Sequence, residues 1–179
     1  MGARLRAYLS CVLTRLSVGT PLIVRPIRPE DKALLTGGLA RLSPASRQKR
    51  FLGPKHRFTL AELRYLTEID GVDHVAYVAL RGDAPKELIA VARLVRNPDD
   101  PTAAEIAVAV GDCFQRRGVG TLLGDVLAMA ARDRGIRWLT ATMAADNAAA
   151  HRLFRHVSTR LSERHDGAVD ELWADLAAA

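Results

Sequence analysis

The sequence predicts a mixed α/β domain built around one twisted sheet, and three observations support this prediction. Apolar patterns with a period of two alternate along the chain with patterns whose period is near 3.6. Segment 118–134 repeats apolar residues at the spacing of one helix face. Segment 157–176 has the pattern of a closing strand pair that turns at Asp166 and Gly167.

Composition is typical of an ordinary globular protein. The 179 residues suit a single domain, and 49% of them are hydrophobic while 26% are charged. No run approaches the roughly 18 apolar residues of a transmembrane helix, so we expect no membrane partner. The five histidines and the two cysteines, Cys11 and Cys113, show no metal-ligand spacing, so we expect no metal. Reduced thiols favour a cytoplasmic location.

Residues 1–20 are expected to form a short amphipathic or frayed N-terminal extension, ahead of one domain over residues 21–179. The apolar run from Ala7 to Leu13 is short, and Arg15 follows it closely. This pattern fits a secretory signal peptide poorly.

The first part of the domain is expected to contain one strand followed by three helices. The strand covers 22–28. The first helix begins at Pro29, because proline is tolerated in a first turn, where Glu30 also suits the helix dipole. Ser43 and Thr59 are typical caps for the other two helices. The expected helices span 29–42, 44–51 and 60–69.

The second part of the domain is expected to be richer in strands. The segment 97–101 contains two prolines and two aspartates and is predicted to be a turn. The amphipathic helix ends at Gly135, a typical residue for this position. Asp146 or Asn147 caps a further helix that runs to about His156. The strands are expected at 74–80, 88–95, 104–110 and 136–143.

The junction between the strand expected at 104–110 and the amphipathic helix expected at 118–134 has the features of a phosphate-binding loop. A helix start exposes unpaired backbone N–H groups at the positive end of the helix dipole. Gly118 and Gly120 carry no side chain that would block an anion from that backbone. Arg116 and Arg117 add positive charge at the rim. Segment 115–121 is therefore expected to bind a pyrophosphate.

Two better-known glycine loops do not fit, because Leu123 stands where a dinucleotide fingerprint needs its third glycine and no Gly-Lys-Ser or Gly-Lys-Thr is present. The pattern Gln115-x-x-Gly118-x-Gly120 instead resembles the acetyl-CoA motif of the GNAT superfamily of N-acetyltransferases. The pattern Asn147-x-x-Ala150-x-x-x-Phe154 is similar to the second motif of that superfamily. This resemblance implies a mixed, mostly antiparallel sheet flanked by helices, with acetyl-CoA in the splay between central strands.

The resemblance also implies roles for individual residues. The strand residues Val108, Ala109 and Val110 would pair with the pantetheine arm through their backbone. Asn147 would lie near the thiol end of the cofactor, and Phe154 stands where many members have a tyrosine that protonates the leaving thiolate. The pyrophosphate would be held by Gln115, Arg116, Arg117, Gly118, Val119, Gly120 and Thr121.

Glu105 is the candidate catalytic residue. Alternation along its strand puts Ile106 on one face, and Glu105 with Ala107 on the other, where little would crowd a substrate. A carboxylate in that place suits a general base that takes a proton from an attacking ammonium. The alternative is a strand-edge glutamate that is simply solvated.

A narrower resemblance connects the chain with the catalytic domain of bacterial protein-lysine acetyltransferases. Segments 27–31, 43–53 and 104–108 are similar to that branch, in which the strand glutamate is the proposed base. The resemblance implies that the acceptor is a protein with a reactive lysine, with an acyl-CoA synthetase as a plausible target.

Three other functions remain open at this point. One is the acetylation of a small amine, such as an antibiotic or a polyamine, and another is that of an inactive relative that binds CoA without chemistry. The formal net charge of +6 also allows a basic nucleic-acid-binding module. The basic residues that would form such a module are Arg47, Lys49, Arg50, Lys55 and Arg57. They lack a helix-turn-helix or aromatic-interleaved signature, so we expect no nucleic-acid partner.

Overall fold

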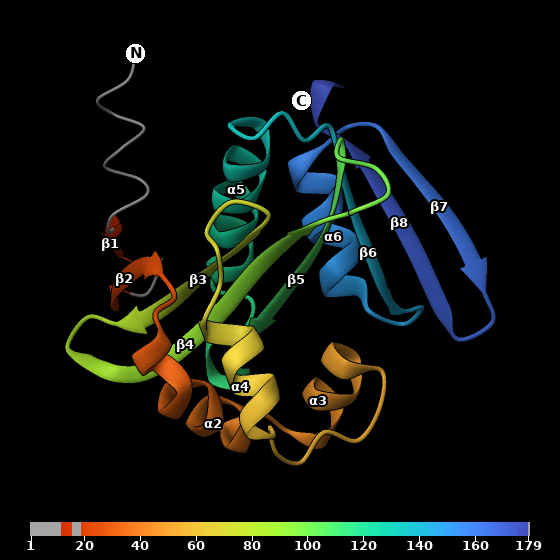
Figure 1. The fold of residues 1–179 in the computed structure, drawn as a ribbon. Coiled ribbons are helices and arrows are strands. Elements are labelled where there is room, and N and C mark those ends of the chain that lie inside the picture. The colour runs from red at the N-terminus through yellow and green to blue at the C-terminus, as the bar shows by residue number, and fades with distance from the viewer. Residues whose placement is uncertain (1–11, 16–18, 179) are drawn as a thin grey trace.

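The structure is a computed structural model that describes residues 12–15 and 19–178. The described strands form one eight-stranded sheet in the order β1-β2-β3-β4-β5-β6-β8-β7 (Figure 1). Only the β5–β6 pair is parallel, so the sheet is mixed and mostly antiparallel, which confirms the predicted class. The strands are β1 Val12–Arg15, β2 Pro21–Pro26, β3 His74–Arg81, β4 Ala84–Arg96, β5 Ala103–Val110, β6 Trp138–Ala144, β7 Leu161–Asp166 and β8 Val169–Asp175.

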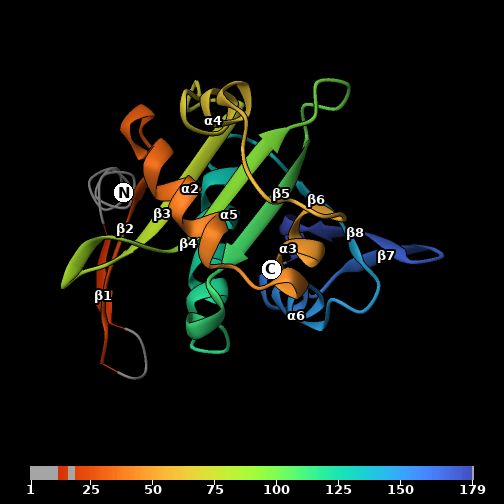
Figure 2. The same cartoon turned by 90° about the horizontal axis from the view of Figure 1, so that it is seen from below.

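Helices cover both faces of the sheet. The α-helices are α2 Lys32–Arg41, α3 Pro44–Phe51, α4 Leu60–Thr67, α5 Val119–Arg132 and α6 Ala148–Val157, with short 3-10 turns η1 Pro29–Asp31, η2 Asp112–Phe114 and η3 Leu176–Ala178. α2 and α4 lie on one face, and α5 and α6 lie on the other (Figures 1 and 2). No helix within the described ranges is long and apolar enough to span a membrane.

The alternation of side chains along β3 shows why the sheet is covered on both sides. Val75, Tyr77 and Ala79 belong to the larger apolar cluster, which includes the buried residues of α5 and α6. Ala76, Val78 and Leu80 belong to a second cluster under α2 and α4. Because successive side chains of a strand point to opposite faces, a nearly continuous apolar strand requires helices on both.

The N-terminal segment departs from the sequence prediction where the structure describes it. Val12–Arg15 form strand β1, which pairs antiparallel with β2 from Val12↔Val24 to Arg15↔Pro21. This segment is therefore part of the sheet and not a frayed extension. The rest of the expected extension, apart from residues 19 and 20, lies outside the described residues.

The helix caps agree with the sequence prediction. Ser43 accepts a hydrogen bond from the N–H of Ser46 at the start of α3. Thr59 and Glu62 form a reciprocal capping box at the start of α4. Asn147, and not Asp146, is the cap of α6. These side chains satisfy N–H groups that a helix start leaves without intrahelical partners.

The feature that positions the site is the divergence of β5 from β6. Their parallel ladder contains only the pairs Ala103↔Trp138, Ala104↔Leu139 and Glu105↔Thr140. β5 then continues to Val110 beside β4 alone, while β6 continues beside β8. The edge of β5 beyond Glu105 is therefore left without a strand partner on the β6 side, in the middle of the sheet.

The direction of the free backbone groups on β5 follows from its pairing with β4. The N–H of Gly111 donates to the carbonyl oxygen of Ile89 at 2.8 Å, so Gly111 points toward β4. N–H groups alternate in direction along a strand, and the pair Ala92↔Val108 keeps the same register. The N–H groups of Val108 and Val110 therefore face the splay.

Candidate active site

A cavity of about 820 Å³ occupies the splay between β5 and β6. Its walls come from β5, the loop before α5, the start of α6 and one side of α3. The structure therefore gathers nearly all of the predicted site residues around one space. Those that line it are Glu105, Val108, Ala109, Val110, Gln115, Arg116, Gly118, Gly120, Thr121, Asn147 and Phe154.

The loop that leads into α5 has the geometry of an anion cradle. Gly118 has a φ of 83°, in the left-handed region that glycine tolerates best. A Cβ built on Gly118 would meet no heavy atom within 4 Å, so the space in front of the loop is open, as a pyrophosphate requires. α5 begins directly afterwards at Val119, and the first-turn N–H groups of this helix are available to a ligand.

Two predicted members of this loop do not line the cavity. Val119 is 1% exposed and belongs to the main apolar cluster, so only its backbone is available to a phosphate. Arg117 is exposed, and its guanidinium lies over the ring of Phe114, 5.8 Å from the centroid. Arg116, with a φ of 58°, is the arginine of this pair that lines the cavity.

A polar network that the sequence analysis missed ties this loop to α3. The side-chain amide of Gln115 donates to the Ser46 hydroxyl at 3.1 Å and to the Val110 carbonyl at 3.2 Å. The carboxylate of Asp112 accepts hydrogen bonds from the backbone N–H of Ser43 and from the hydroxyls of Ser43 and Ser46. Burial acts to raise the pKa of Asp112, but these hydrogen bonds outweigh it and hold the pKa below its ordinary value.

Glu105 lies on the face that the alternation predicted. Ile106 is buried in the main cluster under α5, while Glu105 is exposed and lines the cavity beside Arg50 of α3. Arg50 interacts electrostatically with Glu105: burial lowers the pKa of Arg50, and the negative charge of Glu105 opposes that shift. The Glu105 carboxylate is therefore accessible and near the Arg50 guanidinium. Glu105 is also the last β5 residue that pairs with β6.

A second cavity of about 300 Å³ lies on the face of the sheet that α2 and α4 cover, between the helices α2, α3 and α4 and the strand β4. Its walls are mostly apolar and include Leu39, Phe58 and Leu66. Arg50 and Ala109 line both cavities, so the two spaces adjoin next to the β5 edge. No sequence pattern indicates this cavity, because its walls come from segments far apart along the chain.

Phe154 lines the larger cavity from α6. It is 1% exposed, and its ring joins the main apolar cluster. A phenyl ring donates no proton, so the position that the second motif usually gives to tyrosine supplies packing here and no acid.

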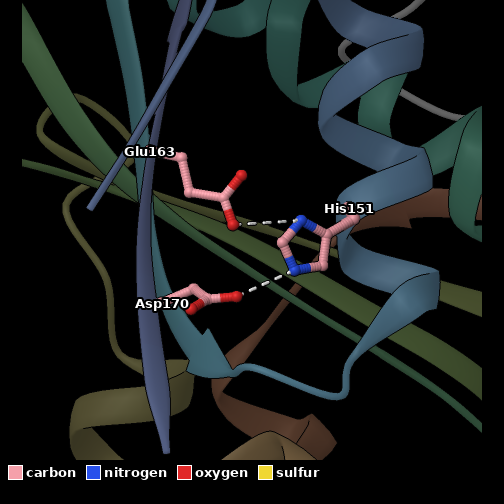
Figure 3. A group of neighbouring side chains, drawn as sticks. All are labelled: His151, Glu163 and Asp170. Atoms are coloured by element: carbon pink, nitrogen blue, oxygen red, sulfur yellow. Dashed lines mark hydrogen bonds and ion pairs between the residues drawn. The ribbon is translucent and has the colours of Figure 1, made fainter. Parts of the chain in front are cut away.

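One further cluster lies outside both cavities. Within the described part of the chain, His151, Glu163 and Asp170 are the only His, Cys, Asp and Glu side chains grouped closely enough to suggest a metal ion. His151 Nε2 is 3.1 Å from Asp170 Oδ2, whereas His151 Nδ1 faces Glu163 Oε1 at 3.9 Å (Figure 3). The two ring nitrogens thus point to different carboxylates, which suits an imidazole that connects α6 to the β7–β8 hairpin.

Comparison with known proteins identifies the class. Residues 45–157 match the model of the acetyltransferase (GNAT) family, and the chain belongs to this family of N-acetyltransferases. It is 33% identical over 150 residues to the acetyltransferase Pat of Mycolicibacterium smegmatis, covering 84% of this chain but 44% of Pat. The chain thus spans less than half the length of that relative.

Solved structures agree with this assignment. The GNAT domain of S. lividans PAT is 28% identical, with a TM-score of 0.82 over 93% of this chain and 97% of that domain. An acetyltransferase from Salmonella typhimurium, solved with its cofactor acetyl-CoA, has a TM-score of 0.67 over 87% of this chain and 94% of that one. At 16% identity, this second likeness concerns the fold.

Proposed function

We propose that this acetyltransferase transfers the acetyl group of acetyl-CoA to lysine side chains of proteins, with Glu105 as the general base. The observation that carries the proposal is the position of Glu105 on the last rung of the β5–β6 ladder. There the carboxylate is open to solvent and borders the cavity of about 820 Å³ in the splay, where we place acetyl-CoA and which we call the cofactor cavity. An acceptor can reach it from the α3 side while acetyl-CoA occupies the splay.

The chain supplies binding, orientation and proton transfer. The first-turn N–H groups of α5 and the charge of Arg116 would hold the pyrophosphate. Acetyl-CoA, when bound, would supply the thioester carbonyl that the amine attacks, and the CoA thiolate would leave as the C–S bond breaks. Glu105 takes the proton from the lysine ammonium, directly or through a water. The N–H of Val108, which faces the splay, can donate a hydrogen bond to the carbonyl oxygen as negative charge develops on it.

The protein acceptor is supported by likeness to the Pat and PAT relatives, and an acyl-CoA synthetase is the first target to test. We place the reaction in the cytoplasm, where an exposed free thiol such as that of Cys113 stays reduced. We take residues 21–179 as the catalytic domain, with the β1 segment added to its sheet.

The test is to incubate the purified protein with labelled acetyl-CoA and a bacterial lysate, and then with a purified acyl-CoA synthetase. Mass spectrometry should find acetylated lysine side chains that are absent when Glu105→Gln replaces the wild type. Acetylation confined to protein N-termini or to small molecules would contradict the lysine assignment and leave the family assignment intact.

A second candidate is the acetylation of a small amine. The adjoining cavity of about 300 Å³ favours it, because that volume suits a small ligand that reaches Glu105 past Arg50. Initial rates with a panel of polyamines, aminoglycosides and amino acids would separate this activity from protein acetylation.

A further inference from the structure

Two arginines line the smaller cavity, and one of them also lines the cofactor cavity. Arg50 comes from α3 and lines both spaces, whereas Arg93 comes from β4 and lines the smaller one. Neither arginine forms a salt bridge with a carboxylate within the described ranges 12–15 and 19–178. Two guanidinium charges that share a partly apolar wall repel each other, and a negative charge between them offsets that repulsion.

Arg93 is a buried cation with neutral hydrogen-bond partners. It is 7% exposed, and its guanidinium donates to the Leu66 carbonyl at 3.2 Å. Its Nη1 also lies 2.6 Å from His74 Nε2, and since arginine has no acceptor, that nitrogen accepts the hydrogen bond and the imidazole is neutral. Burial, followed by the charge of Arg50, lowers the pKa of Arg93 to about 10, so it keeps its charge at neutral pH.

The acids around the smaller cavity are already engaged. Glu87 pairs with Arg81, with the Glu87 oxygen 3.3 Å from Arg81 Nη1. Asp112 accepts the hydrogen bonds of Ser43 and Ser46 described above. Glu105 is therefore the carboxylate whose charge reaches Arg50.

Catalysis removes that remaining negative charge. When Glu105 takes the proton of the acceptor ammonium it becomes neutral, and its charge no longer offsets the repulsion between Arg50 and Arg93. A carboxylate brought by the acceptor would compensate both guanidiniums at this step. Arginine binds carboxylates well, because its planar donors can contact both oxygens.

We propose that Arg50 and Arg93 form an anion subsite of the acceptor cleft, and that the preferred acceptor amine carries a carboxylate close to its reacting nitrogen. If the acceptor is a protein, as proposed above, that carboxylate belongs to an Asp or Glu side chain next to the target lysine. If the acceptor is small, it is an amino acid. The shared chemistry is the carboxylate, and the apolar walls at Leu39, Phe58 and Leu66 accommodate the carbon skeleton that carries it.

The subsite is first tested by binding, without turnover. Calorimetry in the presence of CoA should show that phenylacetate binds the wild type about tenfold more tightly than the neutral phenylacetamide. Arg50→Gln should abolish this preference. Arg50→Lys should retain part of it. Arg155→Gln, which alters an exposed arginine on α6, should leave it unchanged. Equal affinities for the acid and the amide, or a preference that survives Arg50→Gln, would overturn the proposal.

Kinetics then separates the two sources of the carboxylate. Matched peptides in which Glu, Gln or Arg precedes one lysine should differ in kcat/KM, with the Glu peptide about tenfold better than the Gln peptide in the wild type and equal to it in Arg50→Gln. Peptides acetylated without regard to this neighbour would refute the inference while supporting the proposed function. Amino acids acetylated in place of all peptides, with phenylacetate binding still dependent on Arg50, would support the subsite and refute the protein acceptor.

Discussion

Glu105 and Thr140 form the last pair of the parallel ladder between β5 and β6. The hydroxyl of Thr140 donates a hydrogen bond to the carbonyl oxygen of Ala104, the residue before Glu105, at 3.4 Å. This bond joins the two strands directly before they diverge. The proposed base is thus fixed on a strand whose next residue, Ile106, is buried in the core. A base on a rigid strand keeps its orientation toward the cofactor cavity better than one on a loop.

Glu105→Gln should lower kcat by at least about 100-fold, since loss of a general base typically costs 10²–10⁴-fold, while acetyl-CoA affinity stays nearly unchanged. The change keeps the side-chain volume and removes the charge. Stopped-time assays and calorimetry measure the two quantities. Glu30→Gln, at an exposed position in η1, is the matched control and should retain full turnover. Near-normal turnover of Glu105→Gln would show that the base lies elsewhere.

Gly118→Glu should abolish the rise in melting temperature that acetyl-CoA produces in the wild type, because it places a side chain and a negative charge where the pyrophosphate would lie. Gly135→Glu is a close control: Gly135 has a φ of 69°, and like Gly118 it has no heavy atom within 4 Å of a built Cβ. Both variants should be less stable than the wild type, since both force glutamate into a left-handed backbone. Equal cofactor shifts in the two variants would remove the cofactor assignment.

Phe154→Tyr should change kcat by less than about tenfold. The thiolate leaving group is a weak base, with a thiol pKa of about 8.5 against about 10 for tyrosine, so water can reprotonate it without help. For the same reason, the pH profile of kcat/KM in the wild type should rise to a plateau without a falling limb near the tyrosine pKa. A much larger gain in the variant would mean that proton delivery to the thiolate limits the wild-type enzyme.

Asp31→Asn should reduce the free energy of unfolding by about 3 kcal/mol at neutral pH, because it breaks a buried pair. Both oxygens of Asp31 accept hydrogen bonds from Arg25 at 2.7 Å, and the side chain is buried. Burial acts to raise the pKa of Asp31, but the bonds from Arg25 and from the Arg28 N–H outweigh it and lower the pKa below 3.8.

The pH dependence of this contribution follows from the lowered pKa. The stabilisation is fully present above the unfolded value of 3.8 and is lost as the pH falls through the folded pKa of Asp31. Urea denaturation at pH 7 and at pH 3 should therefore show a smaller difference between variant and wild type in acid. Asp83→Asn removes a solvent-exposed partner of Arg81 and should change the free energy of unfolding little at either pH.

The sequence predicted local features better than contacts between distant segments. The caps Ser43, Thr59 and Asn147 lie within three residues of the groups they bind, so short patterns predict them. The strand β1 was missed because four residues carry too weak an alternation to show pairing with β2. The proposed cofactor loop rests on short motifs, since its glycines and the start of α5 are adjacent in the sequence.

The parts of the site that were missed depend on side chains far apart in the chain. The bond from Gln115 to Ser46 joins residues 69 apart, and the cluster of His151 with Asp170 joins residues 19 apart across two elements. The same holds for Arg50 and Arg93, which line one cavity because of how α3 packs over the sheet. No periodicity within one segment encodes such contacts, because they are set by the packing of the sheet and its helices.

α3 has a consequence for exchange with solvent. Arg50 and Phe51 are only half-buried, and most contacts of the helix are polar, among them the hydrogen bond from the Arg47 side chain to the carbonyl of Leu42. Its apolar packing includes the ring of Phe51 against that of Phe58. A helix with so little buried apolar surface unfolds locally at a small fraction of the global free energy. The amide protons of α3 should therefore exchange with deuterium well before those of α5, which buries most of one face. Such local opening would widen the mouth of both cavities and give a bulky acceptor protein access to the strand edge without disturbing the sheet.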